Sequence, residues 1–307
     1  MVCIEHFSIR ITPEKGKYVP APLVKINRPQ ENKVNKMKSR IYYLTILTGL
    51  VSFISAIAYI GQYDGVWSMV VMIIFSLLIP LSAWLWRKNR LISFMLTLFF
   101  TVIVVRNADQ HDWSQVGWLT AITFIPLLIQ AAIVFREGIE KYGTQEAALS
   151  FFRMFVGFNF LTHCTEKLFR SSHDAGLVSF FQNVVGMHTF GTVLSENFAV
   201  TLIVIGGLVE LTSAILIGFG LLTRAGAFIA ALYLVAAEVM SGHFGIGYTW
   251  MMPGGGWEFP FFYFMVTLPF LLPNSAGQLS LDHEWKLAFQ PFLNLFSGVD
   301  ARLNDFD

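Results

Sequence analysis

The chain has 307 residues, of which 55% are hydrophobic and only 13% are charged, and its mean hydropathy is +0.59. Soluble domains carry about 25% charged residues, so this composition excludes an ordinary soluble protein and favours a chain embedded in a lipid bilayer. The net charge of +1 does not by itself indicate a partner, and no nucleic-acid partner is expected. The predicted class is an all-α integral membrane protein.

The first forty residues are predicted to form a basic tail. They carry nine Lys and Arg residues, between Arg10 and Arg40, and they have neither an apolar core nor a helical period. We therefore expect residues 1–40 to be a solvated cytoplasmic tail, either as a topology signal or as an arm that lies against anionic lipid.

Eight apolar segments follow the tail, and each is predicted to be a membrane-spanning helix. They are residues 41–62, 66–86, 91–106, 117–136, 147–169, 198–222, 224–242 and 257–273. The first four have almost no ionisable residues, whereas the last four have several. We therefore divide the chain into a four-helix membrane region (41–146), a four-helix module that carries the chemistry (147–285) and a cytoplasmic C-terminal tail (286–307).

The distribution of Lys and Arg predicts the orientation of these segments. Besides the tail, the positive residues that cluster on one side are Arg87, Lys88, Arg90, Arg136, Lys141 and Arg224. An even number of spans places both termini on that side, which is the cytoplasmic one. We expect a multi-pass protein of a bacterial or archaeal plasma membrane, with its glycine-rich loop "SGHFGIGYTWMMPGGGWEF" facing outward.

Several kinds of site are not expected. The chain has only two cysteines and no CxxC motif, and it lacks ligands at the spacing of a haem or iron–sulfur site. A bound flavin and a phosphate-binding loop are not indicated either. The histidines and glutamates of the module come from separate helices without short ligand spacing, so no metal site is predicted.

Ionisable groups inside a bilayer are costly, and each is a candidate functional residue. In the fifth segment, Asn159, His163 and Glu166 lie at positions i, i+4 and i+7, which places them on one helical stripe. Lys167 has three open alternatives: a pair with Glu166, a pair with a neighbouring helix, or a position near the membrane surface. Arg153, on another face, is either an interfacial arginine or part of a buried ion pair.

Glu210 lies near the centre of the sixth segment, which is the most unfavourable depth for a charge. It must therefore be protonated, or paired with a cation or donor such as Arg153, Asn159 or His163. A purely structural pair and a role toward a ligand or proton both remain open.

Further polar and aromatic residues lie toward the predicted outer end of the last two spans. They are Glu238, His243, Tyr248, Trp250, Trp257 and Glu258. We expect the glycine-rich loop to cover the mouth of a cavity in the bundle, with Glu210, His163 and Glu238 as catalytic candidates. The ligand-binding candidates are Asn159, Arg153, Lys167, His243, Tyr248, Trp250, Trp257 and Glu258. An aromatic interfacial turn without a ligand is the alternative.

Four stretches in order resemble the DoxX/DoxD family of four-helix membrane proteins. They are "RMFVGFNFLTHCTEKLF", "GGLVELTSAILIGFGLLTR", "PGGGWEFPFF" and "GQLSLD", all within residues 147–285. The resemblance implies a DoxX-like four-helix bundle and a membrane redox component similar to the membrane subunit of a thiosulfate:quinone oxidoreductase. It also singles out six residues, namely Arg153, Lys167, Glu210, Arg224, Glu258 and Asp282. The family often has glycine where this chain has Cys164.

Three functions are consistent with these features. The first is a quinone-linked oxidoreductase subunit, because a carboxylate and a histidine beside an apolar pocket suit proton-coupled quinone reduction. The second is a scaffold or assembly subunit in which buried charges fix the helix register. The third is a small-molecule transporter, although no internal repeat supports it. Besides the lipid bilayer, the expected partners are other subunits or further copies of the chain.

Overall fold

The computed structural model describes residues 28–246, 256–285 and 292–299, with the side chains of residues 28–39, 246 and 294 left aside. The chain divides into two compact units, Met1–Lys38 and Ser39–Asp307. The first unit contributes only the beginning of helix α1 (Arg28–Ala58) to the described residues, and all the sites lie in the second.

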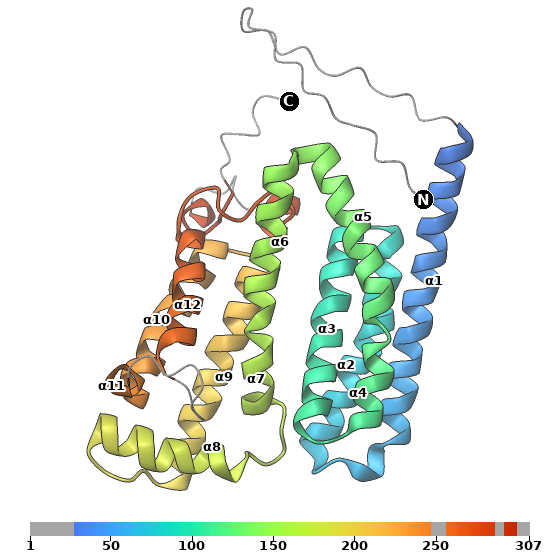
Figure 1. Cartoon of the computed structure of the whole chain (residues 1–307). Helices are drawn as coiled ribbons and strands as arrows, with labels where there is room; N and C mark the ends of the chain where they lie inside the picture. Colours follow the sequence, from blue (N-terminus) through green and yellow to red (C-terminus); the bar gives the residue numbers. More distant parts are fainter. Residues whose placement is uncertain (1–27, 247–255, 286–291, 300–307) are drawn as a thin grey trace, which may run out of the picture. The chain divides into compact units, whose positions relative to one another are not determined.

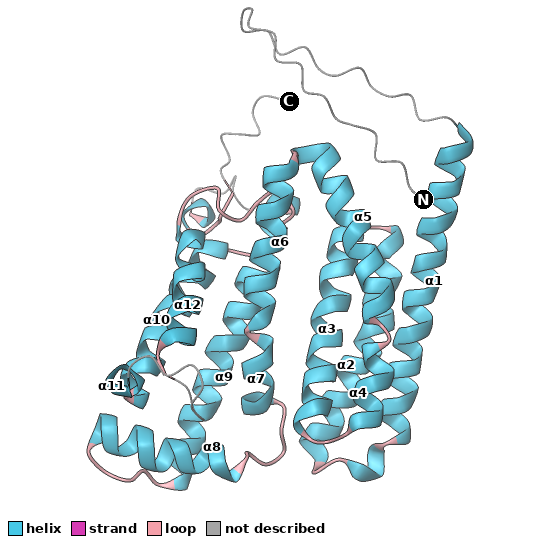
Figure 2. Cartoon of the chain, viewed as in Figure 1, coloured by secondary structure: helices cyan, strands magenta, loops and turns pink. Residues whose placement is uncertain are grey.

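Every regular element that the structure describes is helical (Figure 2), which confirms the predicted all-α class. Six of the described helices are long and apolar enough to cross a bilayer, and the protein is therefore a multi-pass membrane protein. These helices are Arg40–Ala58, Val66–Arg87, Arg90–Gln110, Ser114–Tyr142, Glu196–Gly218 and Thr223–Ser241. They correspond to the first four and to the sixth and seventh of the predicted spans.

The helices that follow α1 in the predicted 41–146 region form a compact group (Figure 1). They are η1 (Ile60–Gln62), α2 (Val66–Trp84), η2 (Leu85–Arg87), α3 (Arg90–Gln110), α4 (Ser114–Ala121) and α5 (Phe124–Tyr142). Helix α3 begins where the side chain of Asn89 accepts a hydrogen bond from the Ile92 amide at 2.9 Å. It packs against α2, α4 and α5.

The remaining helices are those from residue 144 onward. They are α6 (Thr144–Asn159), α7 (Leu161–Leu168), α8 (Ala175–Ser179), the π-helix η3 (Phe180–Phe190), α9 (Glu196–Gly218), α10 (Thr223–Ser241), α11 (His243–Ile246), α12 (Glu258–Thr267), η4 (Leu268–Leu271), α13 (Leu281–Glu284) and η6 (Leu293–Leu295). Helix α9 packs against α6, α7 and α10, and α10 packs against α12. Figure 1 shows these helices side by side.

The fifth and eighth predicted spans are helical but do not form single long helices. The fifth is divided into α6 and α7 at Phe160, where the Phe160 amide donates to the Gly157 carbonyl three residues earlier. This tighter bond replaces one α-helical bond and separates the two helices without a proline. The eighth is a shorter apolar helix, Glu258–Leu271.

Helices α6 and α9 approach each other at two glycines. A side-chain carbon on Gly157 would fall on the backbone nitrogen and Cα of Gly218. Small residues allow this closeness, and the dispersion contacts that result hold membrane helices together where the lipid provides no hydrophobic driving force.

The connection between α7 and α9 contains elements that no sequence pattern predicted. Asp174 accepts hydrogen bonds from the amides of Gly176 and Leu177 and so begins α8, which continues into η3. Val184, Met187 and Phe190 are exposed on η3. These apolar side chains suit a segment that lies along the membrane surface.

Candidate functional site

Arg153 ties together three parts of the bundle. It is fully buried on α6, and its guanidinium donates to the carbonyls of Ala276 (2.7 Å), Ile217 (2.7 Å), Gly218 (3.0 Å) and Leu279 (2.7 Å). Two of these carbonyls, those of Ile217 and Gly218, belong to the last turn of α9, where the helix itself provides no donors; Ile217 also accepts from the amide of Gly220 at 3.0 Å. Of the two predicted alternatives, a buried ion pair and an interfacial arginine, neither describes these contacts in full. The group is deeply buried, but its hydrogen-bond partners are backbone carbonyls.

Asp282 supports the same region from the other side. Its carboxylate accepts from the amide of Leu222 at 2.8 Å and from the amide of Gly298 at 3.3 Å, next to the beginning of α10. Burial nevertheless raises the pKa of Asp282, because the loss of hydration disfavours the charged form more than these donors favour it. Arg224 donates from Nε to the Leu271 carbonyl at 2.9 Å. All of these contacts hold backbone segments in place.

A second buried group joins three helices. Lys167 of α7 donates to Oε1 of Glu210 on α9, and the hydroxyl of Tyr233 on α10 donates to the same oxygen at 2.7 Å. Lys167 also lies 3.3 Å from the Tyr233 hydroxyl. Only 10% of the Lys167 side chain and 5% of the Glu210 side chain are exposed, so this is an ion pair largely removed from solvent.

This group decides between the alternatives that the sequence left open. Lys167 pairs with a neighbouring helix, as one of its three alternatives predicted. The cation beside Glu210 is Lys167 and not Arg153, which is occupied by carbonyls. Tyr233 was missed, although a tyrosine in the middle of an apolar span is a polar group that needs a partner.

Two adjacent glycines of α9 make room for this group. A side-chain carbon on Gly207 would lie 2.8 Å from Cβ of Lys167, and one on Gly206 would lie 3.0 Å from the Tyr233 hydroxyl. The pair "GG" before Glu210 therefore positions both of its partners.

Two more carboxylates lie at the end of the bundle that carries α8 and α11. Glu238 is 5% exposed and Glu258 is 6% exposed. Oε1 of Glu238 lies 3.6 Å from Nδ1 of His243. Trp257 packs edge-on against Phe261, with ring centroids 5.0 Å apart. Tyr248, Trp250 and the glycines of the predicted loop lie outside the described residues, so the lid remains a prediction.

The residues of the polar stripe of the fifth span have different surroundings: the Asn159 side chain lies close to the Tyr263 hydroxyl of α12, whereas His163 does not share a contact with Glu210 among the described residues. His163 is exposed on α7, and the charges that act on it come from Lys167, Glu166 and Arg106. Asn159 is half-buried, and it lines a groove between α6 and the helices of the 41–146 region. Glu210 and Glu238 are buried as expected. The hydrogen-bond partners of Glu210 are Lys167 and Tyr233.

The groove consists of two neighbouring pockets that share Val102, Phe124 and Thr162. One pocket, of about 350 Å³, is almost wholly apolar. Its lining includes Phe94, Leu98, Leu128, Ala131, Phe151, Met154, Phe155 and Phe158, with Asn159 as one of its few polar groups. The second, of about 440 Å³, has charged residues in its wall.

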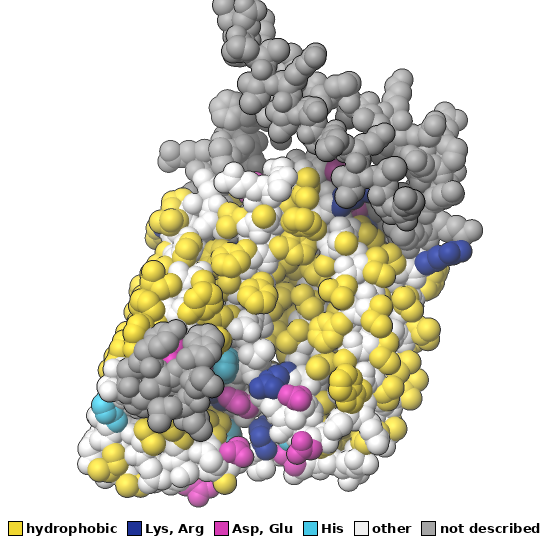
Figure 3. Space-filling view, in the orientation of Figure 1, with side chains coloured by type: hydrophobic (Ala, Val, Ile, Leu, Met, Phe, Trp, Pro, Cys, Tyr) yellow, Lys and Arg dark blue, Asp and Glu magenta, His cyan; other side chains and the backbone are white. Residues whose placement is uncertain are grey.

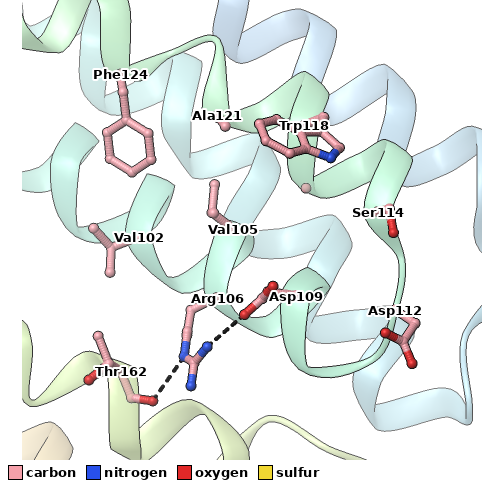
Figure 4. A pocket seen from close by; sticks show the side chains of 11 residues that line it. Val102, Val105, Arg106, Asp109, Asp112, Ser114, Trp118, Ala121, Phe124 and Thr162 are labelled. Atoms are coloured by element: carbon pink, nitrogen blue, oxygen red, sulfur yellow. Dashed lines mark hydrogen bonds and ion pairs between the residues drawn. The ribbon is translucent and has the colours of Figure 1, made fainter.

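Figure 4 shows this second pocket from close by. Arg106 points toward Asp109, with Nη1 at 2.6 Å from its carboxylate, and toward the Thr162 carbonyl at 3.3 Å. Asp112, Ser114 and Trp118 lie on the far side. In Figure 3 the charged side chains gather in the lower part of the view, whereas the face above them is mainly hydrophobic. The groove thus joins a pocket with charged residues in its wall to a neighbouring pocket that is almost wholly apolar.

These features define a multi-pass helical membrane protein with buried polar groups in its second half. Residues 148–243 match the model of the DoxX family, and this stretch is a DoxX family domain. The predicted family is thereby confirmed for these residues, whereas the motifs "PGGGWEFPFF" and "GQLSLD" lie beyond the match. No curated protein and no solved structure matches the chain significantly. Among the described residues, no group of three His, Cys, Asp or Glu is placed to hold a metal ion.

Proposed function

We propose that the protein is a quinone-linked membrane redox component and that the groove between α3, α5, α6 and α7 holds the quinone. The observation that supports this most directly is the continuity of an apolar pocket with a polar one. Small-molecule sites have volumes of roughly 300–1,000 Å³ and apolar walls with a few placed polar groups, and both pockets lie in this range.

The polarity of the groove suits a molecule with a polar ring and an apolar tail. The phenylalanine and leucine side chains of the apolar pocket would contact the tail. Thr162 lines both pockets, and Asn159 lines the apolar one. The Thr162 hydroxyl already donates to the Asn159 carbonyl at 2.7 Å, so the side-chain amide of Asn159 is the group that would donate to a quinone carbonyl. The ring would then lie beside this amide, with the tail extending toward Phe94 and Phe151.

The reaction requires a reductant. Reduction of the quinone takes up two electrons and two protons and yields the quinol. Because the charged pocket contains one cation, Arg106, and two carboxylates, Asp109 and Asp112, it does not favour a dianion such as thiosulfate. We therefore propose that the donor binds at another surface of the protein or on a partner subunit.

Filling the groove tests the proposal. Ala131 lines the apolar pocket, and its neighbour Ala132 is exposed and is not part of the lining, so Ala131→Phe and Ala132→Phe form a matched pair. Decylubiquinone binding to the protein in nanodiscs is measured by the quenching of tryptophan fluorescence. Ala131→Phe is expected to weaken binding about tenfold or more, and Ala132→Phe to leave it unchanged. Equal binding by the two variants would show that the groove does not hold the quinone.

A scaffold role is the second candidate, and one observation favours it. Arg153 and Lys167 are both satisfied by other parts of the protein, as expected for charges that fix helix register. The two functions differ in a turnover assay, in which quinol formation is followed by absorbance with thiosulfate and other donors. A redox component gives donor-dependent quinol that Ala131→Phe abolishes. A scaffold gives none, and its variants change the mass of the assembly instead.

A further inference from the structure

A third pocket lies at the beginning of α10, away from the groove, and shares no lining residue with it. Its volume is about 450 Å³, which is within the range of small-molecule sites. Helix α10 contributes Arg224, Ala225, Phe228 and Ile229 to the wall, and η4 and the end of η6 contribute further apolar side chains. The pocket thus combines an apolar wall with a single cation.

Arg224 is the one polar residue among the described residues that line this pocket. Its Nε donates to the Leu271 carbonyl at 2.9 Å, and its backbone amide donates to the Phe296 carbonyl at 3.0 Å. These bonds fix the residue in the wall, but neither partner carries a negative charge. No described carboxylate forms an ion pair with Arg224, and the nearby Asp282 accepts from backbone amides instead. The two terminal nitrogens of the guanidinium are therefore donors available to a ligand.

The position of the pocket along α10 indicates where such a ligand comes from. Helix α10 is long and apolar enough to cross the bilayer and begins at Thr223, so Arg224 lies at the boundary of the membrane. Phe228, one helical turn further into the span, is 56% exposed, and Leu295 of η6 is 60% exposed. Exposed apolar side chains on a membrane-spanning helix face lipid. The pocket therefore opens toward lipid at the depth of the headgroup phosphates.

We propose that this pocket binds an anionic phospholipid, with its phosphate at the guanidinium of Arg224 and its acyl chains against Phe228 and Ile229. The planar guanidinium offers two parallel N–H groups to a phosphate, which is the geometry that arginine provides and lysine does not. A headgroup with a net negative charge is favoured over a zwitterionic one. A choline ammonium would bring a second positive charge to a wall in which no described carboxylate receives it.

Native mass spectrometry of the intact protein, delipidated in detergent, tests the site with added phosphatidylglycerol and with phosphatidylcholine of the same acyl chains. The wild type should retain phosphatidylglycerol preferentially. Arg224→Gln should weaken phosphatidylglycerol binding about tenfold and remove this preference. Arg136→Gln is the matched control, because Arg136 is predicted on the same side of the membrane but is paired with Glu140 at 2.8 Å, and it should leave binding unchanged. Equal losses in the two variants would show that surface charge alone attracts the lipid.

A second pair of variants tests the pocket without removing the Arg224 contact to Leu271. Ala225→Phe fills the space beside Arg224 and should also weaken phosphatidylglycerol binding, whereas Ala132→Phe, at an exposed position outside this pocket, should not. Unchanged binding by Ala225→Phe, or equal retention of the two lipids by the wild type, would overturn the proposal. Displacement of phosphatidylglycerol by inorganic phosphate alone would do so too, because it would show a site for free phosphate. None of these outcomes depends on whether the groove binds a quinone.

Discussion

The buried pair Lys167 and Glu210 predicts strong energetic coupling between α7 and α9. Glu210→Gln keeps the acceptor for the Tyr233 hydroxyl but leaves the Lys167 ammonium against a neutral amide. Lys167→Met leaves the carboxylate with the tyrosine alone. Because each change strands a buried charge, each is expected to lower the free energy of unfolding by about 3–5 kcal/mol. If the two sites were independent, the double variant would lose roughly 6–10 kcal/mol.

The double variant is instead expected to lie within about 2 kcal/mol of the wild type, because neither charge remains and the Tyr233 bond is kept. Unfolding is followed by circular dichroism in mixed micelles with increasing dodecyl sulfate. Glu166→Gln is the control, since this neighbouring carboxyl group is not part of the pair, and it should cost less than about 1 kcal/mol. Additive losses in the double variant would refute the pairing of Lys167 with Glu210.

Three further predictions follow from the packing and the pH dependence. Gly157→Ala places a carbon on the backbone of Gly218 and should lower the melting temperature markedly. Gly61→Ala is the control, because a Cβ at Gly61 would have nothing within 4 Å, and it should leave the melting temperature unchanged. Equal melting temperatures of the two variants would contradict the close approach of α6 and α9. Arg153→Lys cannot reach all four carbonyls and should cost about 3 kcal/mol in the same unfolding assay, so an unchanged midpoint would argue against the observed contacts. Burial lowers the pKa of His111, so its stabilising contribution is present above the unfolded pKa of about 6.5 and lost as the pH falls through the lower folded value. The acid loss of stability should therefore be smaller in His111→Gln, and identical pH profiles would remove His111 as its cause.

The sequence predicted those parts of the fold that depend on local composition. Apolar runs of sufficient length identified all six long helices, since burial of the backbone in lipid permits little besides a helix. The contacts of Glu210, by contrast, could not be predicted from the composition of one segment. Its partner Lys167 is 43 residues away, and its other partner, Tyr233, is on a third helix. Which residues meet depends on the rotation of each helix about its axis, which the sequence of one helix does not specify.

The stripe of Asn159, His163 and Glu166 shows the same difficulty. The helical period placed these residues on one side of a single predicted span, but it gave no information on which neighbour they face or on the break at Phe160. In the structure Lys167, one helical turn after His163, is a residue of α7 that reaches α9, where Gly207 makes room for it. Asn159 is left to line the groove and His163 to lie exposed. The groove itself involves helices from both halves of the chain, so a search confined to residues 147–285 did not find it.

The contacts of Arg153 have a consequence for how the chain is made. Two of its carbonyl partners, Ala276 and Leu279, are 123 and 126 residues further along. At about 5–20 residues per second, a ribosome needs roughly 6–25 s to reach them after it has added Arg153. During that interval the Arg153 guanidinium lies at membrane depth, or outside the membrane, without two of its carbonyl acceptors. Insertion of α6 is therefore completed only when the last helices arrive, and a nascent chain that ends after α10 retains an incompletely bonded arginine for quality-control proteases to recognise.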